Sequence, residues 1–154
     1  MKKYAFGVDI GGTTCKIGFF ETAGVLLDKW EIHTNTENGG VNILPDVAKA
    51  IDNKLAQEGV SKSEVQGVGV GVPGPVTSGG IVNRCVNLGW GVINVAEELG
   101  KLTGCNGLVF PNNLGKLCFS RSHSNISHRY HSILHHVVRL YSTRCRTNCQ
   151  HEVN

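Results

Sequence analysis

Short apolar runs separated by glycine-rich or polar turns fill the first part of the chain. Residues 4–10, 15–20 and 25–33 form three such runs, and their length and content of β-branched and aromatic residues are typical of strands. Two glycines lie between the first and second runs, and four turn-forming residues lie between the second and third. Because turns this short join antiparallel neighbours, the pattern predicts a three-stranded antiparallel meander.

Helical spacing replaces this pattern in the next segment. Apolar residues recur at intervals of three and four from Leu44 to Leu55, Pro45 suits a first helical turn, and Gly59 stands where a helix would end. A strand of alternating valine and glycine is expected over 65–72, a further strand over 81–86 and a short helix over 95–102. The predicted order β-β-β-α-β, followed by a loop and a helix, indicates an α/β protein with a mixed sheet.

A glycine-rich loop with candidate chemistry separates the first two predicted strands. Gly11 and Gly12 allow backbone N–H groups to approach a bulky anion. The two threonines that follow add hydroxyl donors, and Lys16 adds a positive charge. Asp9, at the end of the first strand, could hold a hydrated Mg²⁺ beside phosphates. The same residues also suit an ordinary glycine turn of a hairpin, so spacing alone leaves both interpretations open.

A second candidate loop follows the valine-glycine strand. Pro73 and Pro75 enclose Gly74 and favour a rigid turn, and strand ends are where ligands bind in open α/β sheets. Asn87 offers a donor and an acceptor, and Trp90 offers a flat apolar face. This combination suits a polyhydroxyl ligand such as a sugar, although a plain turn beside a core tryptophan would have the same sequence.

Three stretches in this order resemble the signatures of the ROK family of sugar kinases, and most of all its bacterial glucokinases. They read FGVDIGGTTCKIG from Phe6, GVGVGVPGPV from Gly67 and NLGW from Asn87, within a likeness that covers about residues 2–104. The resemblance implies the N-terminal lobe of the actin-like, ribonuclease-H-like ATPase fold, with ATP and its Mg²⁺ as cofactors and glucose or a related hexose as substrate. It places ATP phosphates and Mg²⁺ against Asp9, Gly11, Gly12, Thr13, Thr14 and Lys16, and the sugar against Gly74 and Asn87.

The sequence departs from this family after Gly104. The family continues with a strand and an Asn-Asp-Ala-Asn motif whose aspartate is the general base, whereas this chain has Asn112 and Asn113 nearby and no aspartate after Gly104. An amide cannot accept the proton of a sugar hydroxyl. The family's second lobe, second phosphate loop and cysteine-rich zinc motif have no counterpart either. We therefore expect a truncated ATP-dependent glucokinase-type sugar kinase without a catalytic residue of its own and without turnover.

Residues 105–154 differ in composition from residues 1–104. The first segment has nine Lys and Arg against eleven Asp and Glu, whereas the second has six against one and contains six of the seven histidines and four of the six cysteines. So sharp a change predicts a domain boundary near Cys105 and a non-homologous, irregular or helical tail, such as an out-of-frame segment. Its apolar residues from Tyr130 to Tyr141 follow helical spacing and would favour self-association through exposed apolar surface.

Two binding functions of this tail are the alternative to a kinase. Histidines and cysteines four residues apart (His131 and His135, Cys145 and Cys149) could ligate zinc, and the positive charge could attract nucleic acid. Neither has a specific motif, so a non-catalytic binding module ranks second and nucleic acid is not the expected partner.

No apolar run reaches the roughly 18 residues that span a bilayer, and with no cleavable leader after Met1 we expect a cytoplasmic protein without a membrane partner.

Overall fold

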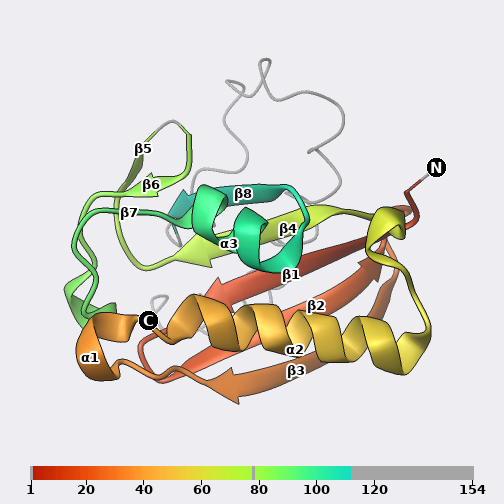
Figure 1. Ribbon diagram of the computed structural model, residues 1–154, viewed down its shortest axis with the longest axis horizontal. Helices are drawn as coiled ribbons and strands as arrows, with labels where there is room; N and C mark the ends of the chain where they lie inside the picture. The colour runs from red at the N-terminus through yellow and green to blue at the C-terminus, as the bar shows by residue number, and fades with distance from the viewer. Residues whose placement is uncertain (1, 78, 112–154) are drawn as a thin grey trace, which may run out of the picture.

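A five-stranded mixed sheet in the order β3-β2-β1-β4-β8 organises the computed structural model, which describes residues 2–77 and 79–111 (Figure 1). β1 runs antiparallel to β2, and β2 runs antiparallel to β3, as the short turns predict. β4 and β8 each run parallel to their neighbours. The strands are β1 (Tyr4–Ile10), β2 (Thr14–Glu21), β3 (Leu26–His33), β4 (Val65–Val72) and β8 (Gly107–Pro111).

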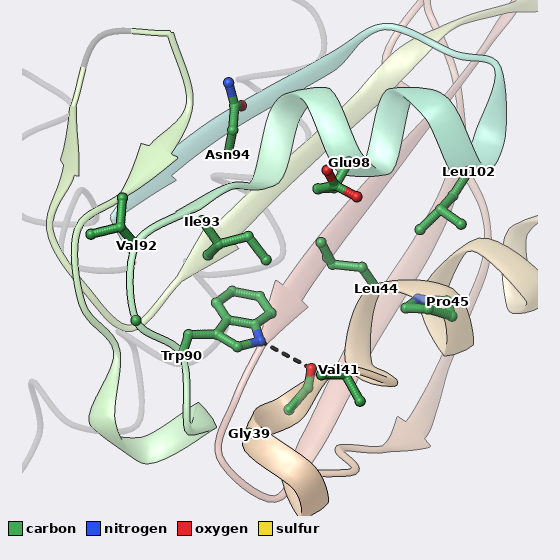
Figure 2. Close-up of a pocket in the computed structure, with 12 residues that line it drawn as sticks. Gly39, Val41, Leu44, Pro45, Trp90, Val92, Ile93, Asn94, Glu98 and Leu102 are labelled. Carbon is green, nitrogen blue, oxygen red and sulfur yellow. Dashed lines mark hydrogen bonds between the residues drawn. The ribbon is translucent and has the colours of Figure 1, made fainter.

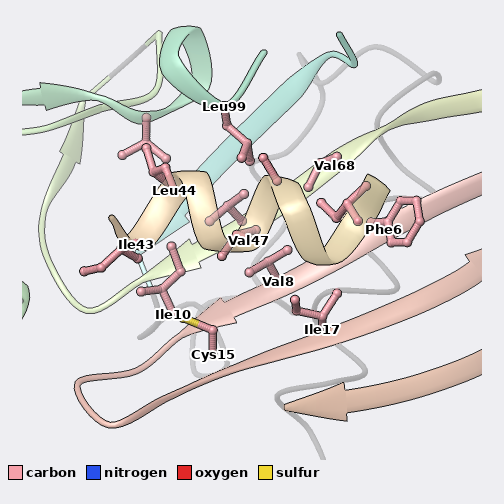
Figure 3. Packing of buried hydrophobic residues seen from close by; sticks show 14 of the residues in the cluster. Phe6, Val8, Ile10, Cys15, Ile17, Ile43, Leu44, Val47, Val68 and Leu99 are labelled. Atoms are coloured by element: carbon pink, nitrogen blue, oxygen red, sulfur yellow. The ribbon is translucent and has the colours of Figure 1, made fainter. Parts of the chain in front are cut away.

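The sheet and α2 (Ile43–Glu58) enclose the core. Val8 and Ile10 of β1 face this helix, together with Ile17 of β2 (Figure 3). On the side of α2 that faces the sheet, Val47 is fully buried. The helix ends at Gly59, whose φ of 66° and N–H bonds to the carbonyls of Leu55 and Ala56 form the predicted C-cap.

A second helix, α3 (Val95–Thr103), packs beside α2 and leads into β8. The side chain of Asn94 accepts a 3.0 Å hydrogen bond from the N–H of Glu97 and caps the start of α3. β8 then pairs with β4, the fourth strand of the sheet, from Val68 to Val72. The sheet thus continues beyond Cys105, where the composition changes, and the predicted boundary itself stays a prediction.

The segment from 73 to 94 forms a small three-stranded sheet and a loop. β5 (Val76–Thr77), β6 (Ile81–Val82) and β7 (Ile93–Asn94) pair antiparallel. The strand predicted over 81–86 is therefore wrong after Val82. Cys85 and Trp90 exchange two backbone hydrogen bonds of 3.0 Å, and this bridge closes a loop around the 3-10 turn η2 (Val86–Leu88).

Several expectations lie outside the described residues. These are the two asparagines at 112 and 113, the apolar stripe from Tyr130 to Tyr141 and the histidines and cysteines proposed as zinc ligands. Over the part of the chain that is described, no helix has the length and apolar character to cross a bilayer.

Candidate functional site

The two predicted ligand loops leave the same edge of the sheet. β1 and β4 are parallel neighbours, and Asp9 near the end of β1 lies opposite Gly71 near the end of β4. The carboxyl ends of both strands therefore point the same way (Figure 1), which brings the loop after Ile10 beside the loop after Val72. This is the edge at which open α/β sheets bind ligands.

The glycine loop is a tight turn that only glycine can begin. The N–H of Gly11 donates a 3.0 Å hydrogen bond to the carbonyl of Thr14. A Cβ on Gly11 would lie 2.8 Å from that carbonyl oxygen, so a larger residue would force the turn open. Gly12 and Thr13 are exposed, and no hydrogen bond within residues 2–77 and 79–111 uses their N–H groups. Two adjacent exposed residues with N–H groups available to a ligand suit an anion such as a phosphate.

Asp9 and Lys16 lie next to this turn as cross-strand partners. Asp9 is 4% exposed at the end of β1, and a single carboxylate beside exposed N–H groups suits a Mg²⁺ ion that phosphates also coordinate. Lys16 extends toward β3, where its Nζ lies 3.8 Å from a carboxylate oxygen of Glu31. Its role toward phosphates stays a prediction.

The second loop is built on close backbone packing around Gly74. A Cβ on Gly74 would lie 3.1 Å from the carbonyl oxygen of Arg84 and 3.4 Å from Cβ of Cys85. The thiol of Cys85 donates a 3.4 Å hydrogen bond to the carbonyl of Pro73, and burial raises its pKa. Because Gly74 has no side chain, residues 73–75 can pack closely against residues 84–85. This packing helps to position Asn87, which follows two residues later.

Asn87 reaches the glycine loop. Its side chain is exposed, and a Cβ built on Gly12 would lie 3.9 Å from Cβ of Asn87. The residue predicted to contact phosphate and the residue predicted to contact sugar are thus neighbours in space, although 75 positions separate them in the sequence. The structure brings together all three motifs that the sequence singled out.

The loop that carries Asn87 is supported by a segment that the sequence analysis missed. Trp90 is 5% exposed and donates its indole N–H to the carbonyl of Gly40 at 3.0 Å. A Cβ on Gly40 would lie 2.2 Å from the carbonyl oxygen of Leu88. Gly40 belongs to the short turn α1 (Glu37–Gly40), and its positive φ of 69° also requires glycine. The adjacent glycines at 39 and 40 were a turn signal, but nothing local linked them to Trp90.

Trp90 also forms one wall of a hollow of about 500 Å³ between α2 and α3 (Figure 2). Leu44, Ile93 and Leu102 line it, with Glu98 at its rim. The indole ring lines this hollow while its N–H is bound to the carbonyl of Gly40 (Figure 2). Trp90 is 5% exposed and hydrogen-bonded, so it acts as a structural wall, and its role toward a sugar stays a prediction.

The scan of the sequence against family models matches the ROK family over residues 5–137. The chain belongs to the ROK family. The match extends beyond the composition change at Cys105, so it does not fix a domain boundary there.

Individual ROK proteins resemble the chain in sequence and in fold. A glucokinase of Halalkalibacterium halodurans is 40% identical over 102 residues, which are 66% of this chain and 31% of that protein. The ROK hexokinase of Thermus thermophilus superimposes with a TM-score of 0.59 at 26% identity, over 73% of this chain and 36% of that one. A ROK glucokinase of Streptomyces griseus, solved with glucose and AMPPNP, superimposes with a TM-score of 0.57 at 24% identity, over 74% and 35%.

These matches confirm the resemblance and the fold predicted from the sequence. The fold is the mixed α/β lobe that solved ROK sugar kinases also contain, and the chain spans about a third of the length of the curated glucokinase it matches. The roles of individual residues at the ROK site stay predictions. Over residues 2–77 and 79–111, no group of three or more histidine, cysteine, aspartate or glutamate side chains could hold a metal.

Proposed function

We propose that this chain is the nucleotide-binding and sugar-facing lobe of an ATP-dependent hexose kinase, with glucose as the sugar. Two facts support glucose. The 40% identical relative is a glucokinase, and the Streptomyces griseus neighbour was solved with glucose and AMPPNP.

The three described cysteines are buried free thiols, as is usual in a reducing compartment, which supports a cytoplasmic location.

The observation that carries the proposal is the proximity of Gly12 and Asn87. Phosphoryl transfer requires the terminal phosphate of the nucleotide and the acceptor hydroxyl to lie next to each other. The Cβ position of Gly12 lies 3.9 Å from Cβ of Asn87, and this proximity supports a shared site in which the proposed anion donors and the proposed hydroxyl-binding side chain would lie next to each other. A turn that served only the hairpin would not need to lie against a polar side chain of a distant loop.

Each residue would act through ordinary binding chemistry. The N–H groups of Gly12 and Thr13 would donate to phosphate oxygens, and the hydroxyls of Thr13 and Thr14 would add donors. Asp9 would hold Mg²⁺, and Asn87 would donate to and accept from the sugar hydroxyls. When bound, Mg²⁺ and ATP supply charge neutralisation and the transferable phosphoryl group.

The lobe would bind ligands without completing the reaction. No aspartate follows Gly104, and Glu152 is the single carboxylate residue of 105–154, so a general base corresponding to the family's aspartate is lacking. The matched segment covers 31% of the glucokinase relative, and a cleft needs two sides to position both substrates. We therefore expect affinity for Mg·ATP around millimolar, about 4 kcal/mol of binding free energy, and no turnover.

Titration of the purified full chain with Mg·ATP, by calorimetry, tests the proposal. Gly12→Ala should weaken binding about tenfold, a loss of about 1.4 kcal/mol, because the added methyl fills the space between the N–H groups and Asn87. Gly91→Ala is the matched control, since Gly91 is exposed and a Cβ there meets nothing within 4 Å. The control should bind as the wild type does.

Two results would contradict the proposal. Wild-type protein that binds neither Mg·ATP nor glucose at tens of millimolar, a concentration well above the expected Kd, would exclude a ligand-binding lobe. Glucose-6-phosphate formed by the full chain, and abolished by Asp9→Ala, would overturn the expected inactivity while supporting the site.

A further inference from the structure

Thr34 is a buried polar residue with two hydrogen bonds to the glycine loop. It follows β3 directly and is 2% exposed. Its N–H donates to the carbonyl of Thr13 at 2.9 Å, and its hydroxyl donates to the carbonyl of Gly11 at 2.7 Å. A residue more than twenty positions away in the sequence therefore holds the carbonyls on either side of Gly12.

These bonds determine which way the loop's N–H groups face. In a trans peptide the C=O and the following N–H point in opposite directions. The carbonyl of Gly11 is drawn inward to the Thr34 hydroxyl, so the N–H of Gly12 in the same peptide unit must point outward. Gly12 is exposed, and its Cβ position lies 3.9 Å from Cβ of Asn87. The hydroxyl thus sets the direction of the donor nearest to the proposed phosphate.

A buried thiol completes the arrangement. The sulfur of Cys15 lies 3.3 Å from the Thr34 hydroxyl oxygen. That hydroxyl has one proton, which it donates to Gly11, so the thiol must be the donor in this contact. Burial raises the pKa of the Cys15 thiol, which keeps it protonated at neutral pH. The resulting chain runs from Cys15 through Thr34 to the Gly11 carbonyl, and linked bonds of this kind strengthen one another.

We propose that Thr34 is a positioning residue for phosphate binding, whose hydroxyl holds the Gly12 peptide with its N–H toward the nucleotide. This inference rests on the proposed function, because it concerns the same anion site. A purely structural threonine would stabilise the fold without affecting phosphate affinity. Thr103 provides that comparison, since it is 1% exposed and its hydroxyl donates to Leu99 at 2.8 Å within α3.

The test compares Mg·ATP affinity and unfolding midpoint in full-length variants. Thr34→Val keeps the volume and removes the hydroxyl, and should weaken Mg·ATP binding about tenfold, or about 1.4 kcal/mol, at temperatures where the protein is folded. Thr34→Ser should restore most of the affinity. Thr103→Val should lower the unfolding midpoint and leave the affinity unchanged. If Thr34→Val does not fold, Thr34→Ser and Thr34→Ala form a second pair that differs by the hydroxyl alone.

The amide resonance of Gly12 separates this inference from the proposed function. It should shift when the wild type is titrated with Mg·ATP or with inorganic tripolyphosphate, and the shift should be lost in Thr34→Val. A response to tripolyphosphate without nucleotide binding would support the role of Thr34 and contradict the kinase proposal. Folded Thr34→Val with wild-type affinity and a wild-type Gly12 shift would overturn the inference, as would a wild-type Gly12 amide that responds to neither anion.

Discussion

Trp90 and Gly40 are joined by a 3.0 Å hydrogen bond from the indole N–H to the glycine carbonyl, across fifty residues of sequence. The bond ties the loop that carries Asn87 to the turn in front of α2. Trp90 is nearly enclosed, so the carbonyl of Gly40 has little access to water as a replacement partner. The position of the proposed sugar-binding residue thus depends on a contact with Gly40, which lies outside every motif.

Replacement of either partner should destabilise the protein. Trp90→Phe retains an aromatic ring but leaves the Gly40 carbonyl without its donor, which should lower the free energy of unfolding by about 1–3 kcal/mol. Gly40→Ala should cost about 2–4 kcal/mol, because its φ is 69° and its Cβ would lie 2.2 Å from the Leu88 carbonyl oxygen. Urea denaturation measures both effects.

Gly59→Ala is the control for backbone conformation alone. Gly59 has a similar φ of 66°, and a Cβ there meets nothing within 4 Å, so the cost should be about 1 kcal/mol. Equal losses for Gly40→Ala and Gly59→Ala would show that the contact with Leu88 contributes nothing.

The two helix N-caps differ in a way that mutation can measure. Asn94 accepts a 3.0 Å hydrogen bond from the N–H of Glu97 at the start of α3, whereas Asn42 at the start of α2 makes no side-chain cap bond. Asn94→Ala should therefore lower the free energy of unfolding by about 1 kcal/mol, and Asn42→Ala by a few tenths at most. Thermal or urea unfolding would contradict this if the two losses were the same.

The ion pair between Asp28 and Lys54 predicts a pH dependence. The ammonium of Lys54, which also lies 5.4 Å from the ring centre of Trp30, donates to Asp28 and lowers the pKa of this carboxyl below its ordinary value of 3.8. A lowered folded-state pKa gives a contribution that is complete above pH 3.8 and is lost as the pH falls through the folded value.

Melting temperatures from pH 7 to pH 2 test this prediction. The gap between the wild type and Asp28→Asn should be present at neutral pH and should close below pH 3.8. Because Asp28 is on the surface, 0.5 M salt should also reduce the gap. A difference that stays constant over the whole range would show that the charge of Asp28 is not involved.

The regular elements were predictable because local patterns determine them. β1 and β4 occupy the predicted residues, since each is a mostly apolar run that is followed directly by a glycine or a proline. α2 begins within a residue of Leu44 and ends at the predicted Gly59. The family signatures identified the glycine loop and Asn87 because both are local sequence features.

The support of the site was not predictable, because it comes from contacts between distant residues. Thr34 is an ordinary residue at the end of a strand until the register of β2 and β3 brings it beside Gly11 and Thr13. Strand β6 ends at Val82, and the backbone of Cys85 bonds to Trp90 instead of continuing the strand. The apolar run over 81–86 does not indicate where this strand ends. Register and loop closure are tertiary effects, and they decide which residues hold the site.

The pairing of β8 with β4 also affects how the lobe is made during synthesis. β4 occupies the fourth place in the sheet, but its outer neighbour is the last described strand and is separated from it by the whole of 73–106. While the ribosome is still producing that stretch, the valine-rich strand Val65–Val72 is an unpaired edge, which is a template for aggregation. Chaperone dependence of the nascent chain should therefore fall once Gly107–Pro111 has emerged.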